Sequence, residues 1–295
     1  MNEQQQSITP KPFLKWAGGK RKSAAEIIGV MKTLVPRGGF QTCHIPFLGG
    51  GGVFFAMRAM GARAPARGFC LSDLNGRLVS TYQAIRENHE AVLTRLDELA
   101  TAHDKEHYYQ QRARSLDGAI DEEEDVEIAA WFLYLNRTCF NGLWRENKRG
   151  MNNVPMGKYK KPFNAVHSLV RAAAPALQGV PVYHCDFREV SIRVQSGDVV
   201  YFDPPYVPLD DTANFTAYTR AGFGPDERAA LRDLAVDLAQ KGAVCLLSDH
   251  DTEQIRELYD PHKGFIARTI MVPRAINSKG EKRGEVPELL VSIGG

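Results

Sequence analysis

Short apolar runs that alternate with helical patterns limit the folds open to this chain more than any other feature. The clearest helical pattern covers 225–241, begins with Pro-Asp-Glu and closes before Gly242. Strands that alternate with helices predict βαβ units, and therefore an α/β fold whose mainly parallel sheet has both faces covered. The expected strands, each of which ends in aspartate or is followed by glycine, are 42–48, 69–73, 180–186, 198–203 and 243–249.

Two further β-rich runs, 265–272 and 288–293, flank a charged loop of glycine and lysine. This arrangement predicts a hairpin at the end of the chain.

The stretch from 76 to 165 breaks the alternation of strands and helices. It is rich in helical patterns and then becomes basic, because 137–161 holds seven Lys and Arg side chains against one acid, Glu146. The acidic run 121–125 nearby predicts a solvated turn or helix start. We therefore predict a catalytic domain formed by 1–75 and 166–295, interrupted by a second domain at 76–165.

Composition is that of an ordinary globular protein, with 43% hydrophobic and 24% charged residues and a net charge of +2. The five cysteines are scattered singly, which favours buried thiols in a reducing compartment over a zinc site or disulfides. No apolar run approaches the ~18 residues of a membrane span. We expect a cytoplasmic protein with no membrane contact, no metal and no obligate protein partner.

Asp203-Pro204-Pro205-Tyr206 follows the apolar run 199–202, so it is expected at the carboxyl end of a buried strand, where open α/β sheets bind ligands. Two prolines remove two N–H donors and stiffen the turn. The Asp203 carboxylate, the Pro204 carbonyl and the Tyr206 ring suit an aromatic amine, because two acceptors favour a pyramidal nitrogen with a localised lone pair. A plain strand-capping turn is the alternative.

Pro46-Phe47-Leu48 and the glycines 49–52 stand between the first expected strand and a helical run at 53–60. Glycines let the backbone approach a ligand closely, and a helix N-terminus offers free N–H groups. Asp73 ends the next strand, where an acid accepts the ribose hydroxyls of a nucleoside. An unremarkable loop is the alternative.

The basic segment 11–22 holds five Lys and Arg side chains and no acid. Within it, Lys15-Trp16-Ala17-Gly18-Gly19-Lys20 places a tryptophan between lysines in a glycine turn. Such a turn suits a carboxylate-bearing cofactor or phosphate, although an unstructured basic N-terminus would have the same composition.

These motifs, in this order, resemble the DNA adenine N6-methyltransferases of the Dam type, in which the cofactor motif precedes an insertion and then DPPY. The resemblance covers nearly the whole chain after Pro10. It is strengthened by three stretches of the insert, 132–137, 140–143 and 153–162, and by 213–218 after DPPY.

The resemblance implies a Rossmann-like sheet, S-adenosylmethionine as cofactor and double-stranded DNA of a bacterium or phage as partner. Asp203, Pro204, Pro205 and Tyr206 would be catalytic, acting on an adenine flipped out of the duplex. The cofactor pocket would be formed by Trp16, Ala17, Lys20, Pro46, Phe47, Gly49, Gly51, Asp73, Asp186, Phe187 and Asp203.

The insert resembles the target-recognition domain of the family. Phe140 and Asn141 would wedge into the duplex, and Arg145 would read guanine. Leu143 and Pro155 would lie near a thymine methyl group, and Lys15 would read guanine from the catalytic side. Together these matches imply the target GATC. The remaining implied DNA contacts are Arg137, Asn147, Asn153 and Lys158.

Three features depart from the family pattern. Thr138-Cys139, and Trp144 and Glu146 on either side of Arg145, are expected to alter base preference. Four consecutive glycines are expected to loosen the cofactor turn. The alternatives left open are cytosine N4 methylation, an RNA or protein amide substrate, and a DNA-binding protein that has lost its cofactor.

Overall fold

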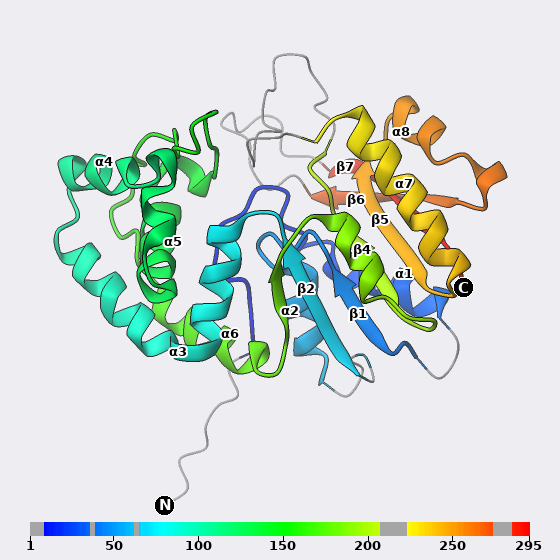
Figure 1. The fold of residues 1–295 in the computed structure, drawn as a ribbon, viewed down its shortest axis with the longest axis horizontal. Coiled ribbons are helices and arrows are strands. Elements are labelled where there is room, and N and C mark those ends of the chain that lie inside the picture. Colours follow the sequence, from blue (N-terminus) through cyan, green and yellow to red (C-terminus); the bar gives the residue numbers. More distant parts are fainter. Residues whose placement is uncertain (1–8, 36–38, 62–64, 66, 207–222, 274–284) are drawn as a thin grey trace, which may run out of the picture.

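A computed structural model describes residues 9–35, 39–61, 65, 67–206, 223–273 and 285–295 (Figure 1). Within them one seven-stranded sheet has the order β3-β2-β1-β4-β5-β7-β6. The strands are β1 (Thr42–Ile45), β2 (Gly68–Asp73), β3 (Val182–His184), β4 (Val199–Phe202), β5 (Val244–His250), β6 (Ile266–Pro273) and β7 (Glu285–Ile293).

The helices alternate with the strands, as the sequence predicts. The α-helices are α1 (Ala24–Leu34), α2 (Gly52–Ala59), α3 (Gly76–Thr101), α4 (Lys105–Ala113), α5 (Asp125–Thr138), α6 (Val166–Leu177), α7 (Pro225–Gln240) and α8 (Glu253–Leu258). Short 3-10 helices are η2 (Leu116–Glu122), η3 (Phe140–Gly142), η4 (Phe187–Ile192) and η5 (Pro261–Lys263).

The sheet is parallel from β3 to β5 and antiparallel where β7 pairs with β5 and with β6. The parallel sheet and the final hairpin are therefore confirmed, and the strand order reverses between β1 and β4 as in Rossmann-like sheets. The loop within the hairpin lies outside the described residues. Asp198 bonds β4 to β1, because its carboxylate accepts from Thr42 N at 2.9 Å and contacts His44 Nε2 at 3.0 Å.

Alternate residues of the central strands pack into two different cores. On β4, Val199 and Tyr201 belong to the core under α1, α2 and α3, whereas Val200 and Phe202 pack against α7 and η4. This period-two alternation shows that both faces of the sheet are covered. α7 begins with Pro225 at its first turn and ends where Gly242 has a φ of 87°.

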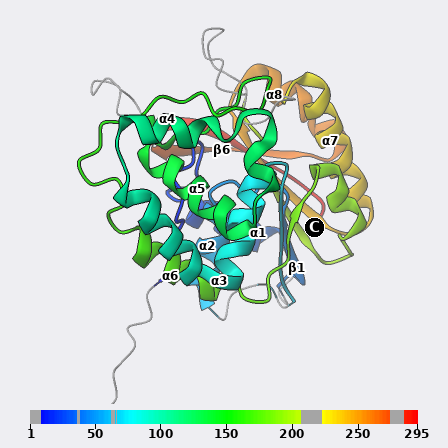
Figure 2. The ribbon, with the colours of Figure 1, turned by 60° about the vertical axis from the view of Figure 1, so that its left-hand side comes forward.

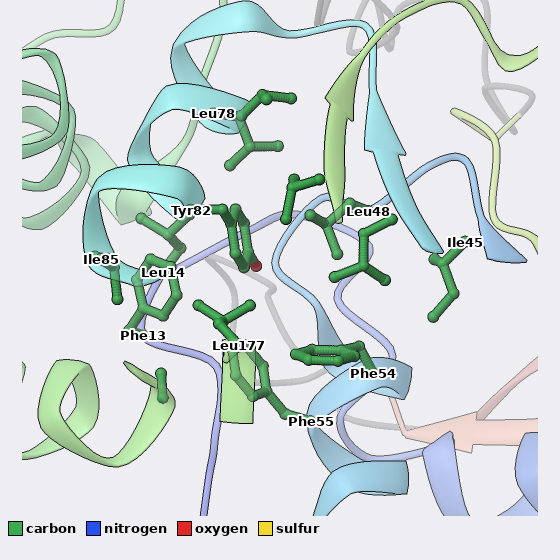
Figure 3. Close-up of a cluster of buried hydrophobic side chains, with 14 of the residues drawn as sticks. Phe13, Leu14, Ile45, Leu48, Phe54, Phe55, Leu78, Tyr82, Ile85 and Leu177 are labelled. Atoms are coloured by element: carbon green, nitrogen blue, oxygen red, sulfur yellow. The ribbon is translucent and has the colours of Figure 1, made fainter. Parts of the chain in front are cut away.

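The larger core reaches the ligand-binding edge of the sheet. Phe13 packs on Tyr82 of α3 with ring centroids 4.9 Å apart, beside Phe54 and Phe55 of α2 (Figure 3). The Tyr82 hydroxyl donates to the Gly49 carbonyl at 3.1 Å. The core therefore fixes the backbone of the glycine turn as well as the position of α3.

Helices α3 to α6 form a helical body beside the sheet (Figures 1 and 2). α3 follows β2 directly, contacts β2 and β3, and packs extensively on α5. The acidic run 121–125 is exposed and extends from the end of η2 to the first residue of α5, which confirms the expected solvated helix start. The division of the chain into a catalytic domain and an insert at 76–165 stays a prediction.

Among the described residues, no helix is both long enough and apolar enough to span a bilayer.

Candidate active site

The carboxyl ends of β1, β2 and β4 carry most of the predicted site residues. β1 leads into the turn that begins at Pro46, β2 ends at Asp73, and β4 leads into Asp203. Because β1 and β4 are neighbours on opposite sides of the strand-order reversal, their carboxyl ends flank the position where sheets of this type bind ligands.

Lys20 joins the DPPY corner, the turn Asp203-Pro204-Pro205-Tyr206 after β4, to the N-terminal basic segment. Its Nζ lies 3.1 Å from Asp203 Oδ1, 3.7 Å from Glu288 Oε2 and 4.0 Å from the centre of the Tyr206 ring. The Lys20 side chain is 4% exposed, whereas Asp203 keeps 19% exposure. One ammonium group therefore lies between two carboxylates, and part of the Asp203 side chain stays exposed.

Tyr206 is held at its hydroxyl and at its ring. The hydroxyl donates to Glu288 Oε2 at 3.1 Å, and the His250 ring meets the Tyr206 ring edge-on at a centroid distance of 4.7 Å. Burial and the nearby carboxylates of Asp203 and Glu288 raise the pKa of Tyr206 well above its usual value. The phenol therefore stays a hydrogen-bond donor, with its ring in a fixed orientation.

The Asp203 carboxyl has a raised affinity for protons. Burial raises its pKa to about 6, although attraction and a hydrogen bond from Lys20 act in the opposite direction. Because this pKa lies below neutrality, Asp203 is a carboxylate at pH 7 and can accept hydrogen bonds from an amine.

The glycine turn is packed against protein rather than loosened. A Cβ added to Gly49 would lie 2.8 Å from Trp16 Nε1, and one added to Gly50 would lie 2.9 Å from Trp16 Cβ. A Cβ added to Gly51 would lie 2.7 Å from the Tyr82 hydroxyl. Because glycine has no side chain, the neighbouring Trp16 and Tyr82 side chains fill the space beside the turn. The expectation of a looser turn is therefore wrong. The glycines bring the Lys15–Lys20 segment directly onto the turn.

Asp73 ties the glycine turn to β2. Its two oxygens accept from Gly49 N and Asn75 N, both at 2.9 Å. Burial raises the pKa of Asp73, whereas these backbone hydrogen bonds act to lower it.

A cluster of three aromatic rings lies at the same edge of the sheet. Asp186 caps η4, and the ring of Phe187 stacks on Phe47 with centroids 5.4 Å apart. Phe223 contacts both rings at 5.6 and 5.7 Å. The structure therefore brings together the turn, Asp73, Asp186 and Phe187, as the resemblance implies.

Trp16 covers the opposite side of the turn and stacks on Phe132 of α5 at 6.3 Å. Ala17 is half-buried beside it, and Pro46 is buried at the start of the turn. Lys20, assigned to the cofactor pocket by resemblance, contacts Asp203, another residue of that predicted pocket, and Glu288.

Most of the predicted DNA contacts of the helical body lie on two antiparallel segments that are joined by a few backbone hydrogen bonds. Phe140 N donates to the Pro155 carbonyl at 2.8 Å, and Asn153 N donates to the Arg145 carbonyl at 3.0 Å. Arg145 Nε also donates to the Asn153 side chain at 2.5 Å. Among these predicted contacts, the exposed ones are Phe140, Arg145, Pro155 and Lys158.

Lys15 is joined to this pairing from the catalytic side. Asn136 bonds both its N–H and its carbonyl, at 2.9 and 2.7 Å, and the Lys15 ammonium lies 3.9 Å from the centre of the Tyr159 ring. A Cβ on Gly142 would meet Lys15 Cβ at 2.4 Å, so the η3 loop rests on this lysine. Asn141 and Leu143, on either side of Gly142, are half-buried.

Several predicted contacts serve the interior of the helical body. Arg137 is 7% exposed and donates to the Phe13 carbonyl, so its assignment as a DNA contact is not supported by its position. The Asn147 side chain accepts from two N–H groups of its own turn, those of Arg149 and Met151.

The two unusual residues beside Arg145 also face inward. Trp144 stacks on Phe132 with centroids 4.1 Å apart, and its indole donates to Glu146. Glu146 in turn accepts from the buried Arg77 at 3.1 Å. Both therefore anchor the segment that carries Arg145 to the helical body, and their expected effect on base preference stays a prediction.

Sequence reasoning missed the buried charged residues around the corner, Glu288, Arg228 and Asp249, and the His250 ring that packs on Tyr206. Glu288 had a visible signal, since a carboxylate next to the apolar run of β7 has to be paired when it is buried. The segment 213–218, part of the family resemblance, lies outside the described residues.

No cluster of three or more potential metal-ligating side chains occurs in the part of the chain that the structure describes.

Known proteins resemble this chain over nearly its whole length. A Type II methyltransferase of Lactococcus lactis subsp. cremoris is 34% identical over 98% of this chain and 97% of its own, and a DNA adenine methylase of Escherichia coli is 35% identical over 95% and 94%. The solved structure of a precorrin 8w decarboxylase covers 98% of this chain and 100% of its own at a TM-score of 0.39 and 12% identity.

The family model described as D12 class N6 adenine-specific DNA methyltransferase matches residues 16–275, which include both the glycine turn and the DPPY corner. The chain therefore belongs to the D12 class of N6 adenine-specific DNA methyltransferases.

Proposed function

We propose that this enzyme transfers a methyl group from S-adenosylmethionine to N6 of an adenine flipped out of duplex DNA, within the sequence GATC. The observation that supports this most is the corner after β4, where the partly exposed Asp203 carboxylate lies beside the fixed ring of Tyr206.

The residues around Asp73 fit the proposed cofactor. The Asp73 carboxylate accepts from Gly49 N and Asn75 N, and since an ionised carboxylate has about four acceptor positions, acceptor capacity is left for a ribose hydroxyl. The stacked rings of Phe47 and Phe187 suit the adenine ring of the cofactor. When bound, S-adenosylmethionine supplies an electrophilic methyl group on a sulfonium centre.

The corner acts on the substrate amine. Asp203 and the Pro204 carbonyl accept the two N–H groups of N6, which favours a pyramidal nitrogen with a localised lone pair. Tyr206 stacks on the extruded base, a contact worth about 1–3 kcal/mol. The hydrogen bond from Tyr206 to Glu288 keeps the ring in place before the base arrives.

The target amine is enclosed in the duplex, so the adenine has to leave the stack before it reaches Asp203. Phe140, 47% exposed at the η3 loop, is an apolar side chain suited to fill the space that the base leaves. The exposed Lys148, Lys158, Lys160 and Lys161 suit phosphate contacts.

The proposed sequence GATC rests on the family resemblance of four positions, Lys15, Leu143, Arg145 and Pro155. Arg145 is exposed, and arginine is suited to bind guanine O6 and N7 at once. Sequencing DNA from cells that express the enzyme, with adenine methylation mapped at each site, tests the assignment. Methylation at a different sequence would refute GATC alone, and no methyladenine at any site would refute the proposed function.

Arg145→Ala is expected to relax recognition at one base pair of the target. The lost bidentate contact costs about 1–3 kcal/mol at that position, measured as the ratio of kcat/KM for matched and mismatched duplexes. The matched control is Lys158→Ala, in which a phosphate contact is lost, so that binding weakens equally for every sequence and the salt dependence decreases. An equal loss on all duplexes for Arg145→Ala would identify it as a phosphate contact instead.

The rate of methyl transfer is expected to fall on the acid side of pH 6. Asp203 has a pKa of about 6 and accepts N–H groups only as a carboxylate, so the single-turnover rate should fall about tenfold per pH unit below that value. Lys20→Met removes the attraction that lowers this pKa, so the fall should begin at a higher pH. A rate independent of pH between 5 and 8, roughly the range that brackets this pKa, would contradict the role of Asp203.

A further inference from the structure

The two prolines of the DPPY corner cannot fix its backbone by donating hydrogen bonds within the turn. Pro204 and Pro205 have no N–H groups, so neither can donate a hydrogen bond within the turn. The carbonyl of Pro205 therefore needs a donor from elsewhere in the protein if the corner is to keep one conformation.

Arg228 of α7 supplies that donor. Its Nη2 donates to the Pro205 carbonyl at 2.5 Å, and the residue is only 5% exposed. A guanidinium is planar and carries its donors in a rigid fork, so it fixes the direction as well as the distance of this contact.

Asp249, near the end of β5, balances the charge of Arg228. The Asp249 carboxylate accepts from Arg228 Nη1 and from His250 N, and the residue is 2% exposed. The buried charge thus has a partner on the sheet itself, which ties the Pro205 carbonyl to the rigid centre of the fold.

The same guanidinium lies 5.3 Å from the ring of Phe223. Phe223 in turn packs on Phe47 and Phe187, the two rings assigned to the cofactor adenine. Arg228 therefore contacts the Pro205 carbonyl of the DPPY corner. It also contacts Phe223, which packs on the two rings assigned to the cofactor.

We propose that Arg228, with its charge balanced by Asp249, is a positioning residue for methyl transfer. By holding the Pro205 carbonyl it sets the directions in which the Asp203 carboxylate and the Pro204 carbonyl face the target amine. This inference rests on the proposed function of the corner. It assigns to Arg228 no contact with the reacting atoms.

The test is the double variant Arg228→Met with Asp249→Asn. Arg228→Met alone would leave the buried Asp249 carboxylate without the guanidinium that balances its charge, whereas the double variant removes both charges and keeps an acceptor for His250 N. Each protein is assayed well below its own melting temperature, with single-turnover methylation of a duplex, cofactor and DNA affinities, and thermal unfolding as readouts.

The double variant should remain folded and bind cofactor and DNA within about threefold of wild type, while its single-turnover rate falls on the order of 100-fold. The matched control is Arg171→Met, which removes an arginine from the exposed pair with Glu90 and should leave the rate unchanged.

Two results would overturn the inference. One is a folded double variant that methylates at the wild-type rate; the other is a double variant that no longer folds, which would make the pair a stabilising element only. An inactive wild-type enzyme would instead refute the proposed function, so the two failures are distinguishable.

Discussion

Asp203→Ala is expected to lower the single-turnover rate of methyl transfer about 10²- to 10³-fold. The change removes the carboxylate that accepts an N–H of the target amine, so the lone pair of nitrogen stays delocalised. The fold should survive, since Lys20 keeps Glu288 as a charge partner at 3.7 Å. Rapid-quench measurement of methyl incorporation, with unfolding curves for both proteins, checks both statements.

The matched variant is Asp203→Asn, which keeps one oxygen acceptor and the shape of the side chain. It should lose less activity than Asp203→Ala, and the fall in rate below pH 6 should disappear because no titrating carboxyl remains. Near-normal turnover by Asp203→Ala would refute the assigned role.

Gly51→Ala is the second change with a large expected effect, here on stability and cofactor affinity. Gly51 has a φ of 70°, which costs a residue with a Cβ about 1–2 kcal/mol. The new methyl group would also lie 2.7 Å from the Tyr82 hydroxyl and 3.0 Å from the Phe55 ring, and such overpacking costs about 1–3 kcal/mol more. Urea unfolding measures the total, and calorimetry measures the affinity for S-adenosylmethionine.

Gly179→Ala separates the two contributions to that loss. Gly179 has nearly the same φ, 71°, but nothing lies within 4 Å of the position of its Cβ. It should therefore show the backbone cost alone and no change in cofactor affinity. Equal losses of stability in the two variants would show that the contact with Tyr82 does not constrain the turn.

Local patterns predicted the arrangement of the sheet well. The apolar run of β4 and the Pro225 start of α7 are local signals, and both appear where the sequence placed them. Because parallel strands end at one edge, the positions of Asp73 and Asp203 followed from the order of the elements.

The surroundings of those residues depend on contacts that no local pattern encodes. Glu288 reaches Tyr206 and Lys20 only because β7 inserts between β5 and β6. The role of the glycines was also hidden, since it depends on which side chains pack on them: Trp16 on Gly49 and Gly50, and Tyr82 on Gly51. The resemblance implied Arg137 as a DNA contact, and no local pattern shows that α5 turns this side chain inward to the Phe13 carbonyl.

The identity of the methylated nucleoside tests the proposed chemistry most directly. Duplex DNA incubated with S-adenosylmethionine and either wild-type enzyme or Asp203→Ala is digested to nucleosides and analysed by mass spectrometry. The structure leads us to expect N6-methyladenine as the product of the wild-type enzyme, and only a small fraction of that amount from the variant. Methylated cytosine in place of methyladenine, or equal yields from the two proteins, would contradict the assignment of Asp203 and its neighbours to the target amine.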